Sequence, residues 1–388
     1  MKIAMIGQKG IPARAGGIER HVEELSKELA KRGYEILVFC RSWYGKAQKN
    51  YQGIECLTTP SIRSKHLDAI THTFTSLLRA SRENVDIFHI HGVGPSLLAW
   101  LPKLLQPSAK VIVTFHCVDR YHQKWNWFAR FMLHLGEWVA CHMADETITV
   151  SQILQHYCQT AYHTQTTYIP NGTQIPMSRS DVSLLNPFSL QPNTYLMMCS
   201  RLVQHKAAHT LIEAWKLLQT EQPTLTKGKK LAIVGGSAFT DDYVQEIKDL
   251  AQGDDSIVLT GTQTGETLKA LFANAYAIVH PSESEGLPIA ILEAMSYGKC
   301  VLSSDIPENR ELTDVCGLTF ETKNVKDLSE KMTWILQHPD LVIAVGEEAR
   351  LHVAKQYDWK DIAEKTAYFY EYATTQPPFF AKVLKPLK

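Results

Sequence analysis

The sequence lacks several features that would place it in common protein classes. Its eight cysteines include no C-x-x-C pair, so neither a zinc ribbon nor a disulfide-stapled scaffold is expected. It has no run of the ~18 apolar residues that a membrane-spanning helix requires, and glycines and a lysine interrupt the N-terminus before a signal-peptide core could form. No D-x-D triplet occurs, so anchoring of a diphosphate through a divalent ion is not expected. We therefore expect a globular cytoplasmic protein that uses no metal and no cofactor.

Charge is balanced overall but unevenly distributed. The 388 residues include 40 Lys and Arg against 40 Asp and Glu, and 45% hydrophobic with 21% charged residues is typical of globular proteins of two to three domains. Residues 1–176 hold 19 basic and 13 acidic side chains, whereas the remainder holds 21 and 27. This asymmetry predicts different partners for the two parts, and an anionic partner for the first.

The opening segment predicts a β-loop-α-β unit. KIAMIG is a short apolar run that ends at Gly7, and EILVFC is a near-continuous apolar run of the kind buried on both faces of a parallel sheet. Between them, one apolar stripe follows a helical period: Ile18, Val22, Leu25 and Leu29. Gly33 provides the helix stop.

The same alternation continues along the chain. Further strands are expected at 85–92, 109–116 and 145–150 and, after a polar stretch beginning YIPNGTQIP, at 194–200, 230–236, 256–261, 277–282 and 300–305. The pattern predicts an α/β fold with two Rossmann-like, doubly wound parallel-sheet domains, 1–176 and 177–359, facing across a cleft. Because ligands of open α/β sheets bind at the carboxyl ends of the strands, the function is expected in that cleft.

A glycine pair follows the first predicted strand. In QKGIPARAGGIER, Gly16 and Gly17 would let backbone N–H groups approach a phosphate at the positive end of the next helix. The spacing matches neither G-x-G-x-x-G nor a P-loop, which disfavours nicotinamide and ATP sites. A plain strand-to-helix turn is the alternative interpretation.

Two cations follow the first strand of the second predicted domain. Arg201 offers a planar fork and Lys206 a mobile point charge, and this pairing suits a diphosphate. The alternative is that both side chains are solvated at the surface.

Two carboxylates flank a predicted helix at 287–297. Glu285 lies just before it and Glu293 about two turns into it, with Pro288 in the first turn and the N–H groups of Gly286 and Leu287 available for phosphate oxygens. Eight residues span roughly 12 Å of helix, so the carboxylates are not an acid/base pair on one bond but could hold two ends of an extended ligand, such as a ribose and a hexose. The alternative is a solvated helix face, against which the apolar neighbours in PIAIL argue.

Histidines are the remaining candidates. His116 ends a predicted strand, from which it could donate a hydrogen bond to a substrate, and Asp119 follows; a structural histidine is an equal alternative. His89 and His91 have ligand-like spacing, but no third ligand at a plausible offset is evident, so no metal site is expected.

These motifs resemble a known family. The E-x7-E element EGLPIAILE, within PSESEGLPIAILEAMSYGKCVLSSDIPENRE, is similar to that of family 4 retaining glycosyltransferases of the two-domain GT-B type, and the similarity extends over essentially the whole chain. QKGIPARAGGIERHVEEL and HCVDRYHQKW resemble a bacterial subgroup that carries the label rhamnosyltransferase, a label that says little about the substrate.

The resemblance implies specific roles. It implies that Gly16 and Gly17 approach the donor phosphates, that Arg201 and Lys206 neutralise the diphosphate, that Glu293 binds the nucleotide ribose and Glu285 the sugar hydroxyls, and that His116 contacts the sugar near the reacting centre. The family commonly has Gly after the lysine, where this chain has Ala207, which puts the local turn in doubt more than the lysine's role. The last helix, within about 360–388, is expected to cross back onto the first domain.

The implied activity is metal-independent transfer, with retention, of a hexose or deoxyhexose from a nucleotide-diphosphate sugar. The acceptor would be a glycan or a polyprenyl-pyrophosphate-linked glycan in bacterial cell-surface polysaccharide synthesis, with no role for nucleic acid. The positive first domain, with Asp119 on its acceptor side and helix 66–82 as a candidate contact, could lie peripherally at the inner face of the plasma membrane. The alternatives are a GT-B-shaped nucleotide-sugar epimerase and a non-catalytic sugar-nucleotide sensor.

Overall fold

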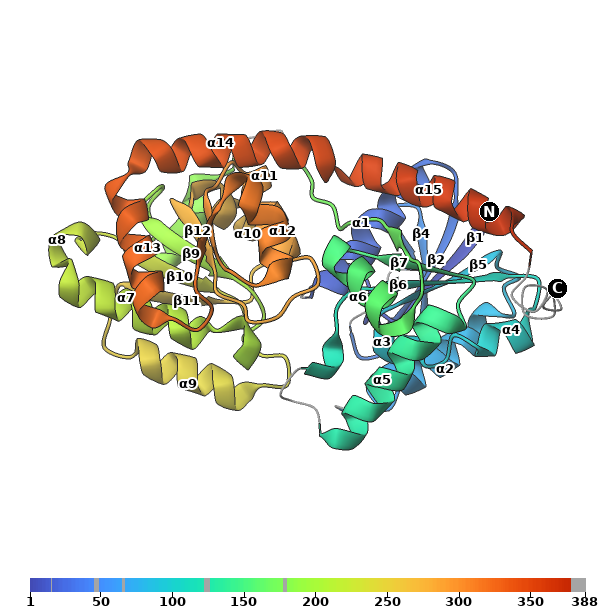
Figure 1. Ribbon diagram of the computed structural model, residues 1–388. Helices are drawn as coiled ribbons and strands as arrows, with labels where there is room; N and C mark the ends of the chain where they lie inside the picture. Colours follow the sequence, from blue (N-terminus) through green and yellow to red (C-terminus); the bar gives the residue numbers. More distant parts are fainter. Residues whose placement is uncertain (15, 45–48, 65–66, 122–125, 177–179, 378–388) are drawn as a thin grey trace. The chain divides into compact units, whose positions relative to one another are not determined.

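The protein consists of two compact α/β units. The computed structural model describes residues 1–14, 16–44, 49–64, 67–121, 126–176 and 180–377 (Figure 1). The first unit comprises Met1–Asn171 and Trp359–Lys388, and the second comprises Gly172–Asp358. The division thus follows Asn171, whereas the sequence analysis placed it after residue 176.

An eight-stranded sheet forms the centre of the first unit, in the order β3-β4-β2-β1-β5-β6-β7-β8. Every neighbouring pair is parallel except β3 with β4. The strands are β1 (Lys2–Ile6), β2 (Glu35–Arg41), β3 (Asn50–Tyr51), β4 (Ile54–Thr59), β5 (Ile87–His91), β6 (Lys110–Phe115), β7 (Glu146–Thr149) and β8 (Thr167–Tyr168). β5 and β6 are buried at every residue, as expected of central strands covered on both faces.

Helices of the first unit follow these strands. They are α1 (Gly17–Lys31), α2 (Asp68–Ala80), α3 (Val93–Ser96), α4 (Leu101–Leu105), the short 3₁₀ helix η1 (Asp119–Tyr121), α5 (Trp127–His142) and α6 (Gln152–Tyr162). The apolar stripe predicted on α1 is buried at Val22, Leu25 and Leu29. Between β5 and β6 the chain forms two short helices, α3 and α4.

The last described helix, α15 (Trp359–Thr375), belongs to the first unit. It packs beside α1, and Trp359, Ile362 and Tyr370 are buried in the same hydrophobic core as β1 and β2 (Figure 1). Helix α15 therefore completes the core of the first unit.

A six-stranded, fully parallel sheet forms the second unit, in the order β11-β10-β9-β12-β13-β14. Its strands are β9 (Tyr195–Cys199), β10 (Lys230–Val234), β11 (Ile257–Gly261), β12 (Ala277–His280), β13 (Val301–Ser304) and β14 (Leu318–Phe320). Its helices are η2 (Val182–Phe188), η3 (Gln204–Lys206), α7 (Ala208–Glu221), α8 (Pro223–Thr226), α9 (Asp241–Ala251), α10 (Gly265–Asn274), α11 (Ile289–Ser296), α12 (Pro307–Cys316), α13 (Val325–Gln337) and α14 (Pro339–Gln356).

The strand orders confirm the prediction of two doubly wound parallel sheets. In each sheet the order reverses on either side of the first strand, so that β1 neighbours β2 and β5, and β9 neighbours β10 and β12. The crevice at such a switch point is where open α/β sheets bind ligands. Among the described residues, no helix has the length and apolar content to cross a bilayer.

We predict that Ile362→Ala lowers the free energy of unfolding of the first unit by about 2–5 kcal/mol, because it empties a fully buried position between α15 and the core. Tyr368→Ala on the same helix, at a side chain that is 74% exposed, is the control and should change it by at most about 0.5 kcal/mol. Urea denaturation followed by hydrogen exchange at the β1 amides reports on this unit separately. Equal losses in the two variants would contradict the packing of α15 described here.

Candidate functional site

The candidate cations of the second unit lie at the switch point of its sheet. The chain leaves β9 at Cys199, passes Arg201 and forms η3, which ends at Lys206. Ala207, where the related family commonly has glycine, adopts the left-handed conformation with φ 54°. The turn is therefore formed with alanine, at a cost of roughly 1–2 kcal/mol for an L-residue in this region.

A buried ion pair joins this turn to the loop after β12. The Lys206 ammonium donates to Oε1 of Glu285, and His280 Nε2 donates to the same oxygen at 2.6 Å. The side chains of Lys206 and Glu285 are only 12% and 10% exposed. Among the described residues, no hydrogen bond to Oε2 of Glu285 is formed, so that oxygen can accept one from a ligand.

This arrangement sets the ionisation of Glu285. Burial alone would raise the pKa of its carboxyl group, but the Lys206 ammonium and the His280 hydrogen bond outweigh it and hold the pKa well below the usual value. Glu285 is therefore an ionised acceptor, not an acid that could donate a proton.

Glu293 lies at the same end of the sheet. Burial raises the pKa of the Cys199 thiol at the end of β9, and the negative charge of Glu293 raises it further. Helix α11 begins at Ile289, so Glu293 is just over one turn into it and not two turns as expected. Pro288 is the N-cap residue, and Gly286 and Leu287 lie in the preceding loop, not at the first turn.

A further carboxylate, which the sequence analysis did not single out, lies nearby. Burial raises the pKa of Glu308 in the first turn of α12, and the charges of Glu285 and Glu311 raise it further. The strand-end loops of β9, β12 and β13 thus bring together two cations, Arg201 and Lys206, and several carboxylates. Among the described residues, Arg201 has no acidic partner, whereas Lys206 is paired.

In the first unit, the glycine pair lies at the start of α1. Gly16 is the N-cap with φ 108°, and a Cβ there would lie 2.1 Å from a carboxylate oxygen of Glu19, so glycine is required. Glu19, in the first turn, accepts a hydrogen bond from the Lys9 amide at 3.1 Å. The positive end of α1 therefore already faces one carboxylate, and any phosphate approaching Gly16 and Gly17 must share the position with it.

His116 lies just beyond β6 and belongs to a buried histidine cluster. His91 Nδ1 and His116 Nε2 lie 3.2 Å apart in a hydrogen bond, and the His21 ring meets the His116 ring edge-on at 4.8 Å between centroids. His21 Nδ1 bonds Asn171 Oδ1 at 2.9 Å, while its buried Nε2 has no hydrogen-bond partner in the described part of the chain. Adjacent strands explain the cluster, because His91 ends β5, His116 follows β6, and His21 lies in α1, the helix that follows the neighbouring β1.

Burial keeps these histidines uncharged. Desolvation lowers the pKa of His21 to about 4 and the pKa values of His91 and His116 well below the usual value. His116 is therefore a neutral hydrogen-bonding group whose tautomer is coupled to that of His91. Asp119 lies in η1, where Cys117 Sγ donates to it at 3.3 Å.

The cluster is also a possible metal site, and it is not the His89–His91 pair that the sequence spacing suggested. His21, His91 and His116 offer nitrogen atoms within 4.8 Å of one another, the one set of three or more such side chains in the described residues that could hold a metal ion. His89, in contrast, bonds Thr114 and Tyr370 with its two nitrogens. These three histidines are therefore the residues at which the expectation of a metal-independent protein has to be tested.

Both parts of the chain match known glycosyltransferase families. A model described as "Glycosyltransferase Family 4" matches residues 15–175, and one described as "Glycosyl transferases group 1" matches residues 187–352. An uncharacterised glycosyltransferase of Methanocaldococcus jannaschii is 22% identical over 96% of this chain and 98% of its own length. The N,N'-diacetylbacillosaminyl-diphospho-undecaprenol alpha-1,3-N-acetylgalactosaminyltransferase of Campylobacter jejuni is 28% identical over 45% of this chain and 44% of its own.

Solved structures share the fold. Sucrose-phosphate synthase from Thermosynechococcus elongatus aligns with a TM-score of 0.81 at 19% identity, covering 96% of this chain and 99% of that chain. Anabaena HepE, solved in complex with UDP-glucose, aligns with a TM-score of 0.78 at 19% identity over 96% and 99%. Together with the two parallel sheets, these matches establish the GT-B fold.

We predict that Lys206→Met destabilises the second unit by roughly 3–5 kcal/mol at pH 7, because it leaves the buried Glu285 carboxylate with His280 as its only partner. The pKa of Glu285 is lowered in the folded state from the usual 4.5, so the pair stabilises the fold above about pH 4.5 and this contribution is lost as pH falls through the lowered pKa. The difference between wild type and variant should therefore shrink in acid.

The control is Lys269→Met, which breaks an exposed pair with Glu266 and should cost at most about 1 kcal/mol. Denaturation curves measured from pH 7 to pH 3 make the comparison. A Lys206→Met loss no larger than that of the control, or one independent of pH, would contradict the assignment.

Proposed function

The chain belongs to the family 4 glycosyltransferases of the GT-B fold, and from this premise we propose that it moves a hexose or deoxyhexose from a nucleotide-diphosphate sugar to a glycan acceptor, with retention of configuration. The observation that carries the proposal is the arrangement at the switch point of the second sheet. There, Arg201 and the Lys206–Glu285–His280 group lie on adjacent strand-end loops. Cations bind an anionic group, and the neighbouring carboxylates accept hydrogen bonds from hydroxyl groups. The arrangement therefore suits a ligand that is anionic in the middle and rich in hydroxyl groups at its ends.

In the proposed complex, Arg201 and Lys206 bind the diphosphate. Glu293 accepts hydrogen bonds from the ribose, and Oε2 of Glu285 accepts them from the transferred sugar. The backbone N–H groups around Gly16 and Gly17, and around Gly286 and Leu287, add hydrogen bonds to phosphate oxygens. The structure of Anabaena HepE in complex with UDP-glucose supports a UDP-linked sugar as the first donor to test.

The proposed reaction breaks the bond between the anomeric carbon and the donor phosphate oxygen, and its electron pair stays on the leaving diphosphate. The acceptor hydroxyl oxygen bonds to the anomeric carbon on the same face, and its proton passes to the leaving phosphate. Arg201 and Lys206 stabilise the charge that develops on the diphosphate. Neutral His116 donates or accepts a hydrogen bond at the sugar, and Asp119 lies toward the acceptor; no protein nucleophile and no metal take part.

We propose a glycan or polyprenyl-pyrophosphate-linked acceptor in cell-surface polysaccharide synthesis, and a cytoplasmic enzyme that works peripherally at the inner membrane face. The C. jejuni relative, whose printed name includes a diphospho-undecaprenol, supports this acceptor class. The positive excess of residues 1–176 suits an anionic acceptor or surface. Helix 66–82, expected as the membrane contact, largely corresponds to α2, which is buried at His72, Ser76 and Leu77.

We predict that one nucleotide-diphosphate sugar, tested first as the UDP-linked form and then as the GDP-, ADP- and dTDP-linked forms, raises the melting temperature of the protein. A ligand at 100 times its Kd adds about 2.7 kcal/mol. With that donor and a lipid-linked glycan, product analysis should show a new glycoside of retained configuration, unaffected by EDTA. Free epimerised sugar nucleotide, stabilisation without transfer, or loss of turnover on chelation would each contradict the proposal.

We predict that Arg201→Ala lowers kcat/KM for transfer by roughly 30- to 1000-fold, since loss of one donor to a developing anion costs about 2–4 kcal/mol. Arg310→Ala is the control, because that arginine is exposed and bonds Asp314 on its own helix. Steady-state kinetics with the donor found above measure both variants. Near-full activity of Arg201→Ala would remove Arg201 from the proposed donor site.

A further inference from the structure

Helix α5 presents an exposed aromatic face. Its exposed large apolar side chains are Trp127 (79% exposed), Phe128 (56%), Phe131 (58%), Leu135 (37%) and Trp138 (44%), more than on any other helix among the described residues. Trp127, Phe131, His134 and Trp138 are spaced by four, three and four residues, which places them along one stripe of the helix. We call this stripe, together with Phe128, Arg130 and Leu135, the α5 face.

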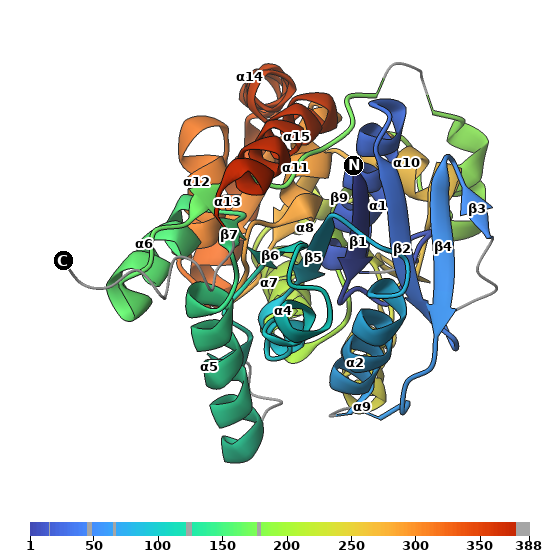
Figure 2. The ribbon, with the colours of Figure 1, turned by 90° about the vertical axis from the view of Figure 1, so that its right-hand side faces the viewer.

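The opposite side of α5 is anchored in the first unit. Gly136 allows close contact with α3, since a Cβ there would lie 2.2 Å from the carbonyl oxygen of Val93. Val139, Ala140 and the side chain of Glu137 are buried. These buried residues all lie in the C-terminal half of α5. The N-terminal half extends away from the sheet (Figures 1 and 2).

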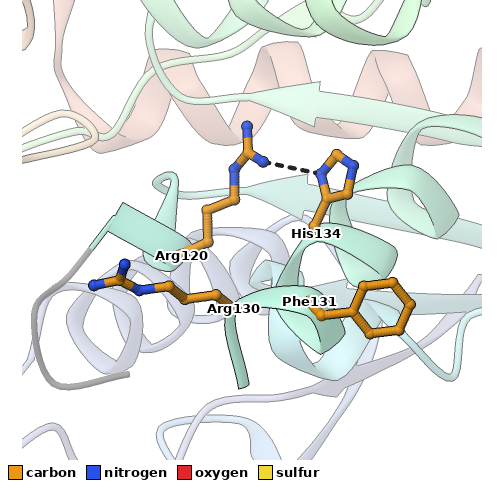
Figure 3. A pocket seen from close by; sticks show the side chains of 4 residues that line it. All are labelled: Arg120, Arg130, Phe131 and His134. Atoms are coloured by element: carbon orange, nitrogen blue, oxygen red, sulfur yellow. Dashed lines mark hydrogen bonds between the residues drawn. The ribbon is translucent and has the colours of Figure 1, made fainter. Parts of the chain in front are cut away.

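A hollow adjoins the aromatic stripe, with two arginines among the residues that line it. Arg120, Arg130, Phe131 and His134 line a hollow of about 310 Å³. Figure 3 shows the Arg120 guanidinium turned toward His134, with a hydrogen bond of 3.1 Å to its Nδ1. The side chains of Arg130 and Phe131 point away from this pair, in opposite directions.

The charges around the hollow are unequal. Arg120 donates to Tyr157 at 2.8 Å and approaches the Glu137 carboxylate at 3.4 Å, so Glu137 offsets its charge. Arg130 is exposed and has no acidic partner among the described residues. Arg130 therefore supplies the net positive charge of the α5 face, in a part of the chain that already has a positive excess.

We propose that the α5 face docks onto an anionic lipid bilayer, with its aromatic side chains in the headgroup and upper acyl region and Arg130 bound to lipid phosphate. Tryptophan and phenylalanine along a helix, beside arginine, match the interfacial layer of a membrane, where apolar rings and cations are both solvated favourably. The same charge favours an anionic leaflet over a neutral one. The inference rests on the proposed function only in that a membrane-borne acceptor requires the enzyme at a bilayer.

Flotation of the full chain with vesicles tests the proposal, using phosphatidylcholine alone or mixed with phosphatidylglycerol, and no donor or acceptor. The wild type should bind the mixed vesicles and bind them less as salt is raised. Trp127→Ser combined with Phe131→Ser should lower the partition coefficient at least tenfold. Arg130→Glu should lower binding to the anionic vesicles and leave the weak binding to neutral ones unchanged.

The matched control is Phe74→Ser on α2, a half-exposed aromatic side chain on the helix first expected to touch the membrane, which should change binding by less than twofold. Melting temperatures establish that the variants are folded. As a measurement that needs no variant, hydrogen exchange of the wild type should show added protection of the amides of residues 127–138 on vesicle addition.

Unchanged binding of the Trp127/Phe131 variant, or loss of binding in Phe74→Ser instead, would overturn the proposal. A second copy of the chain would be the occupant of the face if the wild type bound neither vesicle but self-associated in sedimentation, and if the Trp127/Phe131 variant abolished this self-association. That result would also overturn the proposal. Because donor stabilisation is measured without vesicles, failure of this proposal and failure of the proposed function are distinguishable.

Discussion

The buried bond between the Lys206 ammonium and the Glu285 carboxylate is the constraint on which the proposed donor site depends. A buried carboxylate is unstable without a cation, and Lys206 and His280 together satisfy Oε1 of Glu285. The pair joins the loop after β9 to the loop after β12, and the Glu283 amide, bonded to the His205 carbonyl at 2.8 Å, reinforces the join. The charge of Lys206 is therefore already compensated before any ligand binds.

This compensation changes how a diphosphate would be bound. Arg201 is left as the cation without an acidic partner among the described residues, while Glu293 adds negative charge and Glu308 a further buried carboxyl group at the same strand ends. A bare diphosphate would be repelled by these carboxylates. A nucleotide sugar brings hydroxyl groups that donate to carboxylates at both ends of its diphosphate. In the proposed site the acidic residues therefore select for the sugar and the ribose, while Arg201, whose charge is not compensated, binds the anion together with Lys206.

The sequence predicted the parts of the molecule that rest on local patterns. Near-continuous apolar runs located the central parallel strands, and the period of α1 located its buried stripe. β4, with alternating buried and exposed residues, was missed because its sequence IECLTT shows no continuous apolar run. The two-helix division at 93–105 and the start of α11 at Ile289 depend on backbone geometry that apolar content does not encode.

The contacts that the sequence could not predict are those that the topology creates. His91 and His116 are 25 residues apart and meet only because β5 and β6 are neighbours, and His21 joins them because α1 follows the adjacent β1. His280 appeared as one residue of a strand, and nothing local marks it as a partner of Glu285. Position in the sheet, not spacing in the chain, decides which side chains share a site.

Helix α5 shows why an apolar pattern alone does not locate a core. A helix that packs on a sheet normally buries its large apolar side chains and exposes its charged ones. In α5 the acid Glu137 is fully buried and held by Tyr157 and Tyr162, while Trp127 and Phe131 face water. Each Å² of apolar surface in contact with water costs about 25 cal/mol. Covering the aromatic side chains of α5 with another apolar surface therefore lowers the free energy. The exposed aromatic side chains beside a buried acid are thus themselves an argument that α5 is completed by something outside the described residues.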